Sequence, residues 1–198
     1  MLSQTLTLLM RVLVGAQPRW IGSRRSPALR IYYANHTSHM DTLALWCALP
    51  AELRAKTRPV AASDYWSGAG FKSYIATRGF NALFIERNAD KRERDPLGPL
   101  VEALQRGESL IIFPEGTRRP QALPSPFKSG IFHLAGKMPE AELIPVYLDN
   151  LYRSMPKGTL LPVPLTCSVR FGAALERLPD EGKDAFLERA KQAVVDLA

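Results

Sequence analysis

Short apolar runs alternate with amphipathic segments along most of the 198-residue chain. The apolar runs have strand length, and they lie at 29–34, 59–62, 82–85, 109–113, 142–148 and 166–171. The amphipathic segments have helical spacing, and they lie at 42–49, 64–75, 96–105, 129–137 and 180–197. Strands that alternate with helices predict an α/β fold, here a single domain with a mixed, largely parallel sheet flanked by helices.

Individual residues refine three of these elements. The run at 109–113 is almost continuously apolar, so we expect a strand that is buried on both faces. Pro145 interrupts the run at 142–148, which predicts an edge strand or a bulge because proline cannot donate to a sheet. Asp95 before Pro96 is typical of a helix N-cap, and Gly107 is typical of a helix end.

The first 22 residues differ from the rest and predict an amphipathic helix ahead of the domain at 23–198. Their apolar run is interrupted by Arg11, is too short to span a bilayer, and lacks the pattern of a secretory signal. Trp20 and the nearby arginines are typical of a helix that lies on a membrane surface. Packing of the same apolar stripe on the domain's own core is an equal alternative.

Composition excludes disordered and fibrous classes, because 46% of residues are hydrophobic and 23% are charged. The net charge of +7 suits anionic lipid headgroups, phosphorylated small molecules or nucleic acid. The basic residues come in short clusters rather than a long tract, so we expect no nucleic-acid partner. Cys47 and Cys167 lack metal-ligand spacing, and buried thiols in a reducing cytoplasm are expected.

His36 and Asp41 form the first candidate for chemistry. His36 directly follows a predicted strand, where α/β folds place ligands, and Asp41 lies near the start of the next helix. If the chain turns between them, the carboxylate accepts the imidazole Nδ1–H and leaves Nε2 to take a proton. The same spacing also arises by chance as a surface histidine near a capping aspartate. His39 competes for the role, and Asn35 is expected to brace the loop through local hydrogen bonds.

Arginine and lysine residues after later elements suggest an anion site. Arg87 follows the strand at 82–85 and would present a planar cation to a phosphate, or else form a surface ion pair. Lys128 precedes the helix at 129–137, where the helix dipole also favours an anion. We expect His133, on that helix, to be a packing residue.

The segment at 113–118 follows the most apolar strand and contains a Pro-Glu-Gly-Thr-Arg turn. Such a turn exposes backbone N–H groups and presents Glu115, Thr117 and Arg118 together, although it is not a Walker-type phosphate loop. Glu115 could take a hydroxyl of a polyol phosphate while Arg118 takes the phosphate. A purely structural turn, with Gly116 supplying its conformational freedom, is the alternative.

The order and spacing of these motifs resemble the glycerolipid acyltransferase family, which includes lysophosphatidic acid acyltransferases. The resemblance is carried by residues 35–41, 84–87, 113–118 and 144–146, with looser similarity at 155–158 and 169–172. The chain departs from the family pattern at Glu86, where aspartate is frequent, and at Ala173, near where proline is common. Its N-terminal segment is also short beside the two-helix membrane motif of some members.

The resemblance implies roles for the matching residues. His36 would be the general base and Asp41 its partner, while Arg87, Glu115, Gly116 and Arg118 would bind a phosphorylated acceptor. Ile144 and Pro145 would help to shape the acyl-donor side. The implied reaction transfers a fatty acyl group from acyl-CoA or acyl carrier protein to a lysophospholipid, 1-acylglycerol 3-phosphate above all.

The alternatives keep the fold and change the role. The acceptor could be glycerol 3-phosphate, another lysolipid or an acylated amino-acid lipid, or the chain could be a non-catalytic lipid- or phosphate-binding module. No cofactor and no metal are expected. The expected location is the cytoplasm or the cytoplasmic face of a membrane, with peripheral attachment.

Overall fold

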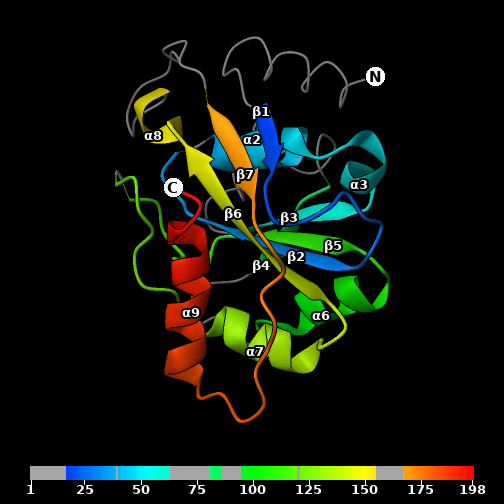
Figure 1. The fold of residues 1–198 in the computed structure, drawn as a ribbon. Coiled ribbons are helices and arrows are strands. Elements are labelled where there is room, and N and C mark those ends of the chain that lie inside the picture. Colours follow the sequence, from blue (N-terminus) through cyan, green and yellow to red (C-terminus); the bar gives the residue numbers. More distant parts are fainter. Residues whose placement is uncertain (1–16, 39, 63–80, 86–94, 120, 155–166) are drawn as a thin grey trace.

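The computed structural model describes residues 17–38, 40–62, 81–85, 95–119, 121–154 and 167–198. Seven strands of this part of the chain form one sheet in the order β1-β7-β6-β2-β5-β3-β4 (Figure 1). The strands are β1 (Gln17–Trp20), β2 (Arg30–Ala34), β3 (Thr57–Ala62), β4 (Leu83–Ile85), β5 (Ser109–Ile112), β6 (Glu142–Asp149) and β7 (Ser168–Phe171). The helices are α2 (Asp41–Ala48), α3 (Ala51–Ala55), α6 (Gly98–Gln105), α7 (Gly130–Lys137), α8 (Leu151–Ser154) and α9 (Lys183–Val195).

The sheet is mixed and largely parallel, which confirms the predicted fold class. Strands β2, β3, β4, β5 and β6 run in one direction, as their parallel pairings show. Strand β7 pairs antiparallel with β6, and β1 pairs parallel with β7. The predicted helix at 64–75 lies outside the described residues.

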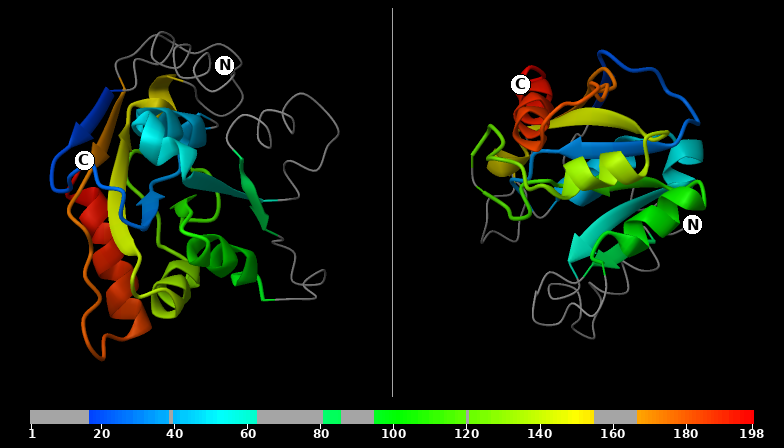
Figure 2. Two further views of the ribbon diagram at one scale, coloured as in Figure 1. Left: turned by 90° about the vertical axis from the view of Figure 1, so that its right-hand side faces the viewer. Right: turned by 90° about the horizontal axis from the view of Figure 1, so that it is seen from below.

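Two apolar layers cover the two faces of the sheet. One layer packs α2 and Leu53 of α3 against alternate sheet residues, among them Tyr32, Ile111 and Ile144. The other layer packs α6, α7 and α9 against the side chains on the opposite face of the sheet, among them Ile31 and Tyr33. Helix α9 runs alongside β6 in both Figure 1 and Figure 2. Alternation of side chains across the strands therefore gives one core on each face.

Residues 17–20 correct the prediction of a helix that reaches residue 22. They form β1, an edge strand in register with β7 from Gln17–Ser168 to Trp20–Phe171. An edge strand tolerates Pro18, which cannot donate to a ladder. The Trp20 ring stacks on Phe171, with ring centroids 4.1 Å apart, so the aromatic residue that suggested a membrane helix anchors the strand. Residues 1–16 lie outside the described part of the chain.

Of the two alternatives predicted at Pro145, the edge strand is wrong, because β6 lies between β7 and β2. The register agrees with the bulge, because Val146 pairs with Phe171 but Leu143 with Leu175, which leaves one extra residue opposite β6. The Pro145 carbonyl faces β7 and accepts a hydrogen bond from the Gly172 N–H at 2.9 Å. The nitrogen of the same residue faces the same neighbour, and the β6–β7 ladder ends next to it, at Val146–Phe171. The missing donor therefore leaves this pair with one hydrogen bond instead of two, at the point where the ladder ends.

Two smaller predictions have different outcomes. Helix α6 begins at Gly98, so Asp95 is not its N-cap; the Asp95 carboxylate instead accepts the Leu97 N–H at 3.0 Å. Cys47 and Cys167 are both buried free thiols, as predicted. Among the residues that the structure describes, no helix is long and apolar enough to cross a bilayer.

Candidate functional site

The loops after β2 and β5 meet at one edge of the sheet, because these strands are adjacent and parallel. From β2 the chain passes to α2 on one face, and α7, which follows the β5 loop, lies on the other face. Neighbouring parallel strands whose connections diverge in this way leave a crevice at their carboxyl ends, where open α/β sheets bind ligands. His36 follows β2, and Phe113 follows β5, so both residues lie at this edge of the sheet.

The predicted pair of His36 and Asp41 is brought together. His36 Nδ1 lies 2.9 Å from Asp41 Oδ2, and Asp41 is the first residue of α2. The same oxygen accepts the backbone N–H groups of Thr37 at 2.6 Å and Ser38 at 2.8 Å. Asp41 is fully buried, so its charge depends on these donors.

This hydrogen-bond pattern fixes the tautomer of the imidazole. A carboxylate oxygen that accepts two backbone N–H groups acts as an acceptor toward the ring as well, so we assign the proton to Nδ1. Nε2 then has its lone pair available, and no described residue hydrogen-bonds to it. The His36 side chain keeps 15% of its surface exposed. The geometry is that of an oriented general base.

The loop after β5 holds His36 from a second direction. The His36 ring stacks on Phe113, with centroids 4.2 Å apart and 18° between the planes. The His36 N–H donates to Glu115 Oε1 at 2.7 Å, and its carbonyl accepts the Arg119 N–H at 3.0 Å. This loop therefore fixes both the ring and the backbone of the histidine.

Glu115 has partners that differ from those that the sequence suggested. It is only 4% exposed, and its second oxygen accepts both the N–H of Ser125, at 3.0 Å, and the Ser125 hydroxyl. Both carboxylate oxygens are therefore occupied by the chain itself, through His36 and Ser125. The burial of the Glu115 carboxylate is therefore explained without a ligand. The predicted contact of Glu115 with an acceptor hydroxyl stays a prediction.

Asn35 braces the histidine loop over a long range rather than locally. Its amide nitrogen donates to the Leu148 carbonyl at 3.1 Å, and its amide oxygen accepts the Leu148 N–H at 2.8 Å. Leu148 lies near the end of β6, so Asn35 completes the ladder between β2 and β6 beyond their last paired residues. The start of the loop that carries His36 is thereby held to β6.

Gly116 and Lys128 lie together beside this loop. Gly116 has φ +71, a conformation that favours glycine, and a Cβ placed there would lie 2.8 Å from Lys128 Nζ, so the lysine side chain would have to shift. The Lys128 N–H donates to the Pro114 carbonyl at 2.9 Å, which ties the start of α7 to the β5 loop. Thr117 is exposed and Arg118 half-buried. The predicted basic residues Arg118 and Lys128 are therefore on the segment that contacts His36.

Other predicted residues have separate outcomes. Arg87 and His39 lie outside the described residues, although β4, which leads toward Arg87, ends at the same edge of the sheet as β2. His133 is exposed on α7, so its prediction as a packing residue is wrong. In the described part of the chain no group of three His, Cys, Asp or Glu residues could hold a metal ion.

Sequence reasoning missed Phe113 and Ser125. Phe113 belongs to a recognised motif, so an aromatic residue after a strand could have indicated stacking. Ser125 lies in a loop without any motif, and only the fold brings it to Glu115.

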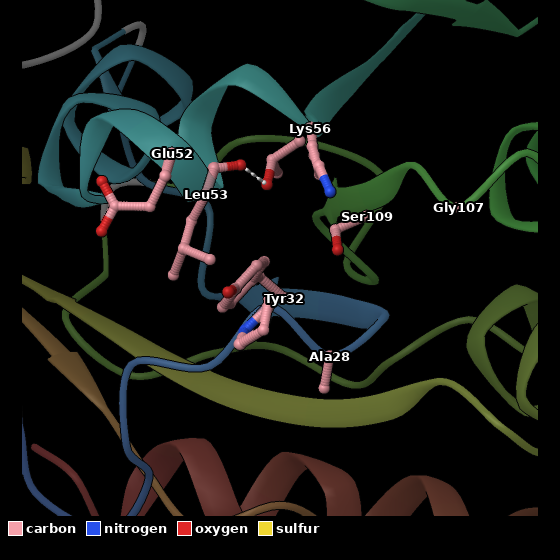
Figure 3. Close-up of a pocket in the computed structure, with 9 residues that line it drawn as sticks. Ala28, Tyr32, Glu52, Leu53, Lys56, Gly107 and Ser109 are labelled. Atoms are coloured by element: carbon pink, nitrogen blue, oxygen red, sulfur yellow. Dashed lines mark hydrogen bonds between the residues drawn. The ribbon is translucent and has the colours of Figure 1, made fainter.

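A pocket of about 90 Å³ lies at the amino ends of the strands, lined by Tyr32, Leu53, Lys56 and Ser109 among others (Figure 3). It is separate from the histidine site.

The fold and site define an α/β protein with a carboxylate-oriented histidine at the carboxyl ends of parallel strands. The model of the Acyltransferase family matches residues 22–149, and the chain belongs to that family.

Several relatives have sequences similar to part of this chain. The chain is 28% identical over 148 residues to 1-acyl-sn-glycerol-3-phosphate acyltransferase alpha of Homo sapiens, covering 71% of this chain and 48% of that protein. It is 26% identical over 158 residues to the 1-acyl-sn-glycerol-3-phosphate acyltransferase of Cocos nucifera, covering 76% and 47%. It is 27% identical over 146 residues to Taffazin of Dictyostelium discoideum, covering 68% and 49%. The chain spans about half the length of these relatives.

A solved structure shares the fold. The crystal structure of the 1-acyl-sn-glycerophosphate (LPA) acyltransferase PlsC from Thermotoga maritima matches with a TM-score of 0.73 at 22% identity. The match covers 98% of this chain and 77% of that one. It therefore supports the α/β architecture over nearly the whole length of this chain.

Proposed function

We propose that this protein is an O-acyltransferase that moves a fatty acyl group to the hydroxyl of a lysophospholipid. The proposed acceptor is 1-acylglycerol 3-phosphate, which would give phosphatidic acid, and the proposed donor is acyl-CoA or acyl carrier protein. The observation that carries the proposal is His36, held by Asp41 at 2.9 Å, in a chain of the Acyltransferase family. The relatives named 1-acyl-sn-glycerol-3-phosphate acyltransferase support this choice of acceptor.

The proposed reaction needs one base and no covalent enzyme intermediate. His36 Nε2 takes the proton of the acceptor hydroxyl as its oxygen attacks the thioester carbonyl. The tetrahedral intermediate collapses, the carbon–sulfur bond breaks, and the departing thiolate takes the proton back from His36. Asp41 stabilises the imidazolium that exists between these two steps. No cofactor enters this scheme.

Recognition of the acceptor phosphate is assigned to the basic residues near the base. Lys128 lies over Gly116, and Arg118 and Thr117 follow in the same loop. This loop also stacks Phe113 on His36, so a phosphate held by it would keep the acceptor close to Nε2. Arg87 is proposed as a further phosphate ligand from its place in the sequence.

The test is a screen of donors and acceptors with the purified full chain. Acyl-CoA or acyl carrier protein is mixed with 1-acylglycerol 3-phosphate, glycerol 3-phosphate or other lysolipids, and thiol release and product mass are followed together. We expect thiol release that depends on 1-acylglycerol 3-phosphate, with phosphatidic acid as the product. Turnover of a different acceptor would keep the chemistry and change the substrate, whereas binding without any transfer would indicate a lipid-binding module.

We further propose peripheral contact with an anionic membrane on the cytoplasmic side. Ile21 is 62% exposed, and the arginines near it, Arg19, Arg24 and Arg25, are exposed as well. An apolar side chain among cations suits a bilayer surface that carries anionic lipids. Cosedimentation with anionic but not neutral vesicles is the expected result, and equal binding to both would contradict it.

A further inference from the structure

The backbone of His36 depends on a carboxylate that is itself held by a distant serine. His36 donates its N–H to Glu115 Oε1 at 2.7 Å. Glu115 Oε2 accepts two hydrogen bonds from Ser125, from its N–H and from its hydroxyl. The chain from 115 to 125 is thereby closed into a loop whose two ends meet at one carboxylate.

The Glu115 carboxylate is buried, so its orientation depends on its hydrogen-bond donors within the protein. The Glu115 carboxylate is only 4% exposed, and its oxygens accept hydrogen bonds from His36 and Ser125. Ser125 therefore decides how the carboxylate group is turned, and its orientation sets where Oε1 meets the His36 N–H. The base is held at its ring by Asp41 and at its backbone by Glu115.

We propose that Ser125 and Glu115 are positioning residues for the base, and that Glu115 does not bind the acceptor. This inference rests on the proposed function, in which His36 takes the acceptor proton. A reacting group must be held within about 0.5 Å of its productive place, so a carboxylate that can turn lowers the rate of the chemical step. Binding of the acceptor is affected much less, because Arg118 and Lys128 stay where they are.

The kinetic test compares two serine-to-alanine variants of the full chain. Ser125→Ala removes one hydroxyl contact and leaves the backbone contact, so we expect kcat to fall about three- to tenfold with the KM for the acceptor nearly unchanged. Ser109→Ala is the matched control, because the Ser109 hydroxyl accepts the Arg30 N–H at 3.0 Å at the other end of the sheet. It should lower the melting temperature similarly and leave kcat unchanged. Ser125→Thr, which keeps the hydroxyl, should restore the rate.

A second readout does not depend on activity. The chain has three histidines, so the ring ¹⁵N signals of His36 can be assigned by their loss in His36→Ala. We expect Ser125→Ala to shift these signals, and Ser109→Ala to leave them as in the wild type. The ring signals respond to positioning even if no lysolipid is acylated, in which case the proposed function fails and the positioning role stands.

Two results would overturn the inference. His36 signals that are unchanged in Ser125→Ala would show that the serine does not hold the base. A raised acceptor KM with unchanged kcat in that variant would instead place the Glu115 carboxylate in acceptor binding.

Discussion

The two ends of the parallel strands bury charges of opposite sign. At the carboxyl ends the buried groups are the carboxylates of Asp41 and Glu115. At the amino ends they are the guanidinium groups of Arg30 and Arg54. Helix α2 connects the two ends, with Asp41 in its first turn and Arg54 beside its last carbonyls, so both charges complement the helix dipole.

The partners of these charges explain why only one end is a candidate active site. The Arg54 guanidinium donates to the carbonyls of Cys47 and Leu49, and Arg30 bonds Glu142 at 2.7 Å, so each cation satisfies fixed groups. At the carboxyl end Asp41 holds a titratable ring that has a nitrogen available for a proton. Buried charge alone therefore does not define a site; what matters is a reactive group oriented by that charge.

Removal of the carboxylate at the carboxyl end should have the largest effect. Asp41→Ala leaves the His36 Nδ1–H and two backbone N–H groups without an acceptor, so we expect a loss of stability on the order of 2–4 kcal/mol. The rate of acyl transfer should fall about 100-fold or more, because the ring loses its orientation. Denaturant unfolding and kcat check the two effects, and a folded variant with near-wild-type kcat would contradict the account.

Removal of a cation at the amino end should cost stability alone. Arg54→Met keeps an unbranched side chain near Trp46 but removes the donors to two helix-end carbonyls and a cation–π contact of 5.1 Å. We expect the free energy of unfolding to fall by about 1–3 kcal/mol. The kcat of the folded variant, measured well below its melting temperature, should match that of the wild type. A loss of kcat comparable with that of Asp41→Ala would remove the distinction between the two ends.

Two neighbouring tyrosines of β2 provide the smallest and most controlled comparison. The hydroxyl of Tyr33 is buried and has no hydrogen-bond partner among the described residues, whereas Tyr32 interacts with the guanidinium group of Arg30, which lowers the pKa of Tyr32 against the larger effect of burial. We expect Tyr33→Phe to leave the free energy of unfolding unchanged or to raise it by about 1 kcal/mol. Tyr32→Phe should lower it by about 1 kcal/mol. Denaturant unfolding at neutral pH measures both, and an equal loss in the two variants would contradict the hydrogen-bond argument.

Burial of Tyr33 also makes the free energy of unfolding depend on pH in the alkaline range. Burial raises the pKa of Tyr33 above its ordinary value of 10.0. In the unfolded chain the Tyr33 hydroxyl ionises near pH 10, whereas in the folded chain it stays protonated. The contribution of Tyr33 to the free energy of unfolding is therefore complete below pH 10 and is lost as the pH rises toward the folded pKa. Tyr33→Phe should therefore lose less stability than the wild type when the pH is raised from 9 to 11. Melting curves across that range test this expectation.

The sequence predicted the parts of the fold that depend on local patterns. The central strands and α2 follow from apolar runs and spacing, and the meeting of His36 with Asp41 follows from five residues of separation. Strand β1 could not be predicted in this way, because four residues with a proline become a strand only by pairing with β7, about 150 residues later. The interior place of Pro145 depends likewise on where β7 ends.

The candidate site shows the same limit. His36, Asp41, Glu115, Arg118 and Lys128 could be selected from motifs, but the role of Glu115 depends on its partners. The contact with Ser125 and the bond from Asn35 to Leu148 join residues that no local pattern relates. Side-chain partners at long range are set by the fold, so sequence motifs name the residues without giving their contacts.

The central claim is that His36 is the base of an acyl transfer, and one measurement tests it most directly. The rate of acceptor-dependent thiol release is compared between His36→Ala and His133→Ala, which changes an exposed histidine on α7. General-base assistance contributes roughly 10²–10⁴-fold, so we predict at least a 100-fold loss for His36→Ala and no loss for His133→Ala, with both proteins folded. Near-wild-type turnover by folded His36→Ala would contradict the account.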